Sequence, residues 1–130
     1  IDPARTYGYV TVLRPDKHLI FRYVFRREHY PWLMSWMNYS GDARAARGTE
    51  FSSQPFDISR QEAVAMNPLF DTPTFRWLPA KSKIESRFLM FYTKVPDDFS
   101  KIDDVTLDSG KLTIVDHSGK RMTLAASKGL

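Results

Sequence analysis

Apolar and polar residues alternate along much of the chain with the period of two that is typical of β-strands. The clearest case runs from His18 to Arg26. The short turn Arg14–Lys17 separates it from an earlier β-branched and aromatic run, Tyr7–Leu13, so the two runs predict a hairpin. One face of the second strand is aromatic and the other includes charged residues. We expect the aromatic face to point into a core; it consists of Leu19, Phe21, Tyr23 and Phe25.

Two further strands and a short helix are predicted in the middle of the chain. Trp32–Tyr39 is largely apolar on both faces, which favours a central strand, and Ser40-Gly41-Asp42 turns it into a fourth strand, Arg44–Phe51. Ser59-Arg60-Gln61-Glu62 has the form of a capping box, so we expect a helix to run to about Met66.

The remaining pattern is again β. Phe75–Leu78 and Ile84–Val95 are read as two strands joined by Pro79–Ser82, and Val105–Ala125 contains the alternating runs and turn residues of a terminal meander. The predicted fold is therefore an all-β antiparallel sandwich with one short helix. Residues 1–130 are expected to form a single domain.

Composition narrows the classes of function. The chain has 42% hydrophobic and 26% charged residues, as ordinary globular proteins do, and its lack of cysteine excludes disulfides, thiolate zinc sites and a cysteine nucleophile. The net charge is +4, but the basic residues are interleaved with acidic ones rather than gathered in one run. This distribution disfavours nucleic acid as a partner. The spacing of histidines and carboxylates suggests no metal site, and we expect no cofactor.

The sequence contains no leader and no apolar stretch of the roughly 20 residues that a membrane span needs. A soluble protein without a membrane partner is therefore expected. The location stays open: the protein is either cytoplasmic, or periplasmic or secreted.

Glu50 is the first candidate functional residue. On the fourth strand it shares a face with the small residues Ala46, Gly48 and Ser52, and this leaves space above its carboxylate, as a ligand site would. The alternative is a structural Glu50 that forms a salt bridge with Arg47 or Arg87.

Aromatic and polar residues near Glu50 suggest a sugar site. Trp32 and Trp36 share a strand face with Asn38, and an indole offers a flat apolar surface to the C–H side of a pyranose. Polar side chains would serve the sugar hydroxyls; the candidates are Asn38, Arg47, Gln54 and Asp57. In the alternative interpretation both indoles are simply core residues.

Three segments together resemble the C-terminal part of the galactose mutarotase-like proteins, the aldose epimerase superfamily. They are YPWLMSWMNYSG, ARGTEFSSQPFD and FRWLPAKSKIESRFLMFYTKV, which cover roughly Tyr30–Val95. Gly48-Thr49-Glu50-Phe51 is similar to the family's Gly-x-Glu-Pro-like motif with phenylalanine in place of proline. Leu78–Ser82 is similar to its Leu-x-Pro-Gly-Glu-like turn, with the glycine and glutamate replaced.

The resemblance implies a β-supersandwich of which this chain is a part, and a role for Glu50 as the general base in anomer interconversion. The family's acid histidine lies upstream of this region, and none of the histidines here has its sequence context; they are His18, His29 and His117. Three functions therefore stay open: a mutarotase-like domain, a non-catalytic carbohydrate-binding module, and a structural or interaction domain. If half of the fold is absent, an exposed apolar patch or a homo-oligomer is expected.

Overall fold

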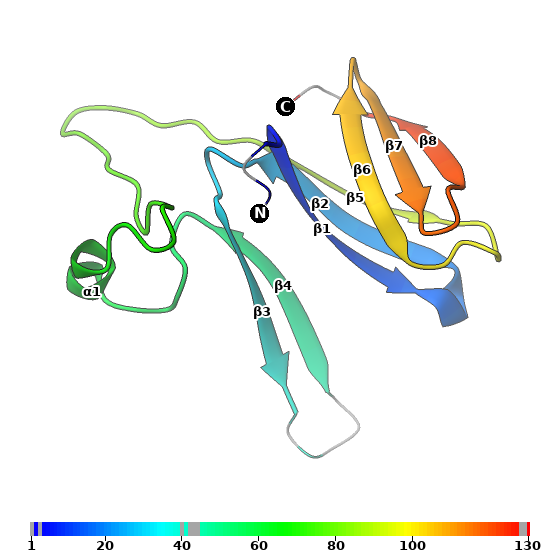
Figure 1. Cartoon of the computed structure of the whole chain (residues 1–130), viewed down its shortest axis with the longest axis horizontal. Coiled ribbons are helices and arrows are strands. Elements are labelled where there is room, and N and C mark those ends of the chain that lie inside the picture. Colours follow the sequence, from blue (N-terminus) through cyan, green and yellow to red (C-terminus); the bar gives the residue numbers. More distant parts are fainter. Residues whose placement is uncertain (1, 3, 40, 42–44, 128–129) are drawn as a thin grey trace. The chain divides into compact units, whose positions relative to one another are not determined.

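The computed structural model describes residues 2, 4–39, 41, 45–127 and 130 (Figure 1). The chain divides into two compact units, one formed by Ile1–Val10 and Arg26–Ser86 and the other by Thr11–Phe25 and Arg87–Leu130. The prediction of an all-β antiparallel fold with one short helix is confirmed. The expectation of a single domain stays a prediction.

The described part of the chain contains eight strands, one α-helix and one 3₁₀ turn. The strands are β1 Tyr7–Arg14, β2 Leu19–Arg26, β3 Trp32–Asn38, β4 Ala46–Ser52, β5 Phe88–Lys94, β6 Ile102–Asp108, β7 Lys111–Asp116 and β8 Arg121–Ala125. The helices are η1 Pro15–Lys17 and α1 Arg60–Ala65. Among the described helices, none has the length and apolar character that crossing a membrane requires.

The second unit contains the main core. β2 and β5 pair antiparallel in the sheet β1-β2-β5, and β6, β7 and β8 form the meander that the sequence predicts (Figure 1). Buried apolar side chains come from β2, from β6 and β7, and from the segment after β5, as expected for a sandwich-like core. They are Ile20, Val24, Phe25, Val95, Phe99, Val105, Leu112 and Ile114.

The predicted orientation of β2 is wrong. The face that contains Ile20, Arg22 and Val24 is buried, whereas Leu19, Phe21 and Tyr23 on the aromatic face are only half-buried. Phe25 is the one residue of the aromatic face that is fully buried. The side chains across from this face on β5, including Met90 and Tyr92, are exposed.

In the first unit β3 and β4 form a two-stranded antiparallel sheet. β3 is therefore not a central strand, because β4 is its single partner in the described part of the chain. Three apolar side chains along this strand are exposed: Leu33, Trp36 and Met37. The expectation that half of the fold is absent stays a prediction. Most of the predicted turn Ser40-Gly41-Asp42, and the predicted strand start at Arg44, lie outside the described residues.

The predicted helix and its capping box are confirmed. The Ser59 hydroxyl accepts from the Glu62 backbone N–H at 3.3 Å, and the Glu62 carboxylate accepts from the Ser59 N–H at 2.9 Å. Thr74, which is fully buried, donates its hydroxyl to the Ala63 carbonyl at 2.6 Å and so ties the following segment to α1.

Two strand predictions next to this helix need correction. Phe75–Leu78 is irregular, because Thr74 holds its start against α1 and no described strand pairs with it. The strand expected over Ile84–Val95 begins only at Phe88, where pairing with β2 starts.

Candidate functional site

The register of the hairpin places Trp36 and Glu50 on the same face. Trp36 pairs with Gly48 and Met34 with Glu50. Directly paired residues in an antiparallel sheet project to the same side. Trp36 on β3 and Glu50 on β4 therefore lie on the same face of the hairpin. Strand parity alone did not predict that they share a face.

A hollow of about 570 Å³ lies over this face and the segment that follows β4. Its volume is within the range of small-molecule sites, about 300–1,000 Å³. We call it the Glu50 hollow; the side chains that matter most for its chemistry are Trp36, Glu50, Ser53, Gln54, Phe56 and Asp57.

Trp36 lies next to Gly48, which has no side chain. A Cβ atom at residue 48 would be 3.5 Å from Trp36 Cβ, 3.6 Å from Trp36 Cε3 and 3.8 Å from Glu50 Oε1. These are ordinary van der Waals distances, so the indole and the carboxylate both lie close to the Gly48 backbone. The Trp36 side chain is nevertheless 53% exposed, which leaves apolar surface for a ligand.

The described residues that line the hollow include two carboxylates and no cationic side chain. Glu50 and Asp57 are both exposed, and neither forms an ion pair within the described part of the chain. The predicted alternative of a Glu50–Arg47 salt bridge is therefore not observed. The carboxylate oxygens can accept hydrogen bonds from a bound ligand.

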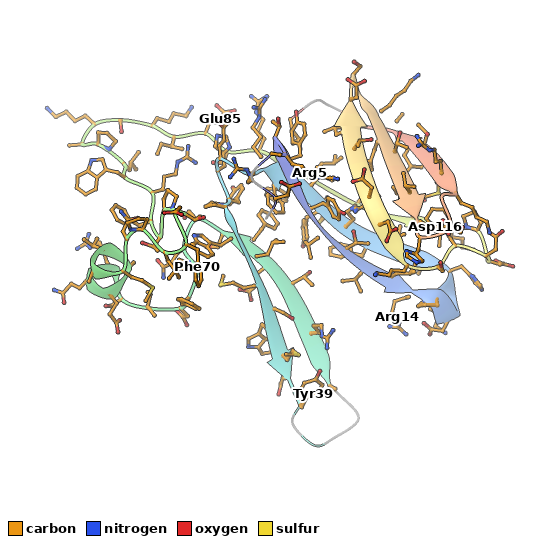
Figure 2. The ribbon with its side chains drawn as sticks, in the orientation of Figure 1. Arg5, Arg14, Tyr39, Phe70, Glu85 and Asp116 are labelled. Carbon is orange, nitrogen blue, oxygen red and sulfur yellow. The ribbon has the colours of Figure 1, made fainter. Side chains whose placement is uncertain are left out.

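Arg47 lies on the opposite face of the hairpin, because it pairs with Met37. Its Nη2 donates to Tyr39 Oη at 3.3 Å and contacts Met37 Sδ at 3.6 Å. Figure 2 shows Tyr39 just beyond the end of β3. Arg47 is thus placed away from the Glu50 hollow.

The other predicted residues divide into two groups. Gln54 lines the hollow, but its Nε2 donates to the carbonyls of Phe56 at 2.6 Å and Ile58 at 3.1 Å, so part of its role is to shape the loop. Trp32 and Asn38 share the strand face without lining the hollow. Trp32 Nε1 donates to the Pro73 carbonyl at 2.6 Å, which is a structural contact.

Five lining residues were not predicted. Met34 has the same strand parity as Trp36 and could have been found from that signal, and Ser52 likewise shares the face of Glu50. Ser35, Ser53 and Phe56 carry no such signal, because their positions depend on the register and on the path of the loop after β4.

No histidine lines the Glu50 hollow. His29, in the same unit, lies in a different hollow with its Nε2 3.5 Å from Glu28 Oε1. His18 and His117, in the second unit, have their Nδ1 atoms 3.3 Å from Asp97 Oδ1 and 3.0 Å from Asp103 Oδ2. The described residues thus provide an acceptor-rich aromatic site with no imidazole acid in it. They also contain no group of three or more metal-ligating side chains arranged around a common point.

The site is therefore an open hollow of aromatic and carboxylate residues on the hairpin of an all-β protein. No known protein family, curated protein or solved structure matches the chain.

Proposed function

We propose that the Glu50 hollow binds a carbohydrate. The observation that carries the proposal is the half-exposed Trp36 indole next to two unpaired carboxylates, Glu50 and Asp57. The indole supplies the apolar face on which a pyranose ring stacks, and the carboxylates accept hydrogen bonds from its hydroxyl groups. Ser52 and Ser53 add hydroxyl groups at the same hollow.

The side chains that line the hollow favour a binding protein over a catalyst. Anomer interconversion needs a base and an acid on either side of the sugar. Glu50 supplies a carboxylate that can act as a base, but the described residues that line the hollow include no histidine of the kind that the mutarotase-like resemblance implies for the acid. Catalysis with Glu50 as base is our second candidate function. Pairing with a missing half of the fold, or with a second copy, stays a prediction.

Trp36→Ala is expected to weaken binding of a monosaccharide by roughly 10- to 100-fold, because it removes the stacking surface. Titration of the purified chain with a panel of aldoses, followed by NMR chemical shifts, measures the affinity. Met37→Ala is the matched control, since Met37 is similarly exposed on the opposite face of the same strand. Equal losses in both variants would contradict a sugar site at Trp36.

Glu50→Gln is expected to weaken the same binding by roughly tenfold, because a charge-assisted hydrogen bond becomes a neutral one. The change is nearly isosteric, so the melting temperature should stay unchanged. Anomer exchange is measured in the same samples by NMR. Exchange that is accelerated by the wild type and lost in Glu50→Gln supports catalysis, whereas exchange that survives the substitution removes Glu50 as the base. Binding with no accelerated exchange identifies a binding module.

A further inference from the structure

A second hollow of about 460 Å³ adjoins the Glu50 hollow within the same unit. Ser53 and Gln54 line both, so the two hollows adjoin at the segment after β4. We call it the Trp77 hollow. Its lining also includes Arg60 at the start of α1, and Phe75, Arg76 and Trp77 from the irregular segment that follows the helix.

The two hollows have opposite charge. The ionisable side chains in the Glu50 hollow are both carboxylates, whereas those in the Trp77 hollow, Arg60 and Arg76, are both cations. Neither arginine forms an ion pair within the ranges that the structure describes. Arg76 Nη1 donates to Ser86 Oγ at 3.1 Å, which positions the guanidinium without neutralising it.

Each hollow also has its own aromatic surface. Trp77 is 75% exposed in its hollow, as Trp36 is exposed in the other. A tryptophan with this much exposed surface contributes little to a core, because most of its apolar area stays in water. Two such indoles in two adjoining hollows, together called the groove, offer separate stacking surfaces for two sugar rings.

We propose that the groove binds an oligosaccharide that carries an anionic group on one of its sugar units. A neutral unit stacks on Trp36 and hydrogen-bonds to the carboxylates. An anionic unit stacks on Trp77 with its charged group between Arg60 and Arg76, since guanidinium groups bind carboxylate, sulfate and phosphate oxygens through charge-assisted hydrogen bonds. The proposal rests on the carbohydrate-binding function proposed for the Glu50 hollow.

The test compares five probes on the purified chain by isothermal titration calorimetry: galactose, maltotriose, maltotriose with glucuronate as its terminal unit, glucose and glucose 6-phosphate. The glucuronate trisaccharide carries one carboxylate and is expected to bind about tenfold more tightly than maltotriose at low salt, and the difference should shrink at high salt as exposed charges are screened. Glucose 6-phosphate, compared with glucose, distinguishes a phosphate from a uronate as the preferred anion. Tighter binding of either anionic probe than of its neutral counterpart supports the proposal.

Variants separate the two hollows. The double variant Arg60→Gln and Arg76→Gln should remove the preference for anionic sugars and leave galactose binding unchanged. Trp77→Ala should weaken binding of both trisaccharides but not of galactose. Arg47→Gln is the matched control, because it removes an exposed cation on the far face of β4.

The outcomes distinguish this proposal from the one on which it rests. Galactose binding that depends on Trp36, with no preference for anionic probes, overturns the anionic oligosaccharide and keeps the sugar site. A preference that survives in the double arginine variant overturns it as well. If Trp36→Ala changes no affinity at all, the carbohydrate function of the Glu50 hollow fails, and the proposal for the two adjoining hollows fails with it.

Discussion

Replacing Ile20 by alanine is expected to lower the free energy of unfolding by about 2–5 kcal/mol, the usual cost of emptying a buried aliphatic site. Ile20 is fully buried and lies on the face of β2 that forms the core of the second unit. Urea denaturation followed by circular dichroism measures the loss as a lower midpoint. The native strand signal in the absence of urea should be retained.

Phe21→Ala is the matched control, one residue along the same strand. The substitution removes a larger side chain, but Phe21 is only half-buried, so the expected loss is roughly 1 kcal/mol. Its ring forms an edge-to-face pair with Tyr23, with ring centroids 5.0 Å apart. A loss at Phe21 that equals or exceeds the loss at Ile20 would show that the aromatic face is the core after all.

β2 shows how far the sequence could predict the fold. Alternation identified the strand and its two faces correctly, because a period of two follows from backbone geometry. It did not identify the buried face. Arg22 is fully buried, although arginine rarely is, and its presence made the face it shares with Ile20 look like the solvent side.

The candidate site illustrates a second limit. The sequence identified Trp36, Glu50, Gln54 and Asp57, and the structure gathers these four around one hollow. Side-chain type and strand parity were sufficient to select them. The position of Arg47 relative to Trp36 depends on the pairing register. The observed register puts Arg47 on the face opposite Trp36.

The Trp77 hollow could not be predicted from the sequence, for a different reason. Phe75–Leu78 was expected to be a strand, in which Arg76 and Trp77 would point to opposite sides of a sheet. In the irregular segment that is observed, both side chains line the same hollow as Arg60 from α1. The contact of Thr74 with Ala63, eleven residues apart, holds this arrangement, and no local pattern in the sequence predicts it.

Asp116→Ala is expected to produce the other large loss of stability, because one buried carboxylate organises the turn between β7 and β8. Asp116 is 1% exposed and is the last residue of β7; Figure 2 labels it beside the strands of the meander. Its Oδ1 accepts from the Ser118 hydroxyl at 2.7 Å and from the N–H groups of Ser118 and Lys120, both at 2.9 Å. Its Oδ2 accepts from the Ser100 N–H at 3.4 Å. Alanine leaves these donors without their acceptor, and we expect the melting temperature to fall by roughly 10 °C.

The same carboxylate predicts how stability depends on pH. Burial disfavours its charged form, but the hydrogen bonds from Ser118, Lys120 and Ser100 outweigh burial, so the pKa of Asp116 lies below its ordinary value. A pKa that is lower in the folded than in the unfolded state stabilises the fold above the unfolded pKa of about 3.9. That contribution is lost as the pH falls through the lower, folded pKa.

Asp116→Asn isolates this contribution from the rest of the turn. Urea midpoints measured between pH 7 and pH 2 should show a less stable variant at neutral pH and a shallower loss of stability below about pH 4 than in the wild type. Asp97→Asn is the matched control, since that carboxylate belongs to the same unit and its side chain is 93% exposed. Its acid profile should follow the wild type. If Asp116→Asn also follows the wild-type profile, the buried carboxylate is not a source of the acid sensitivity.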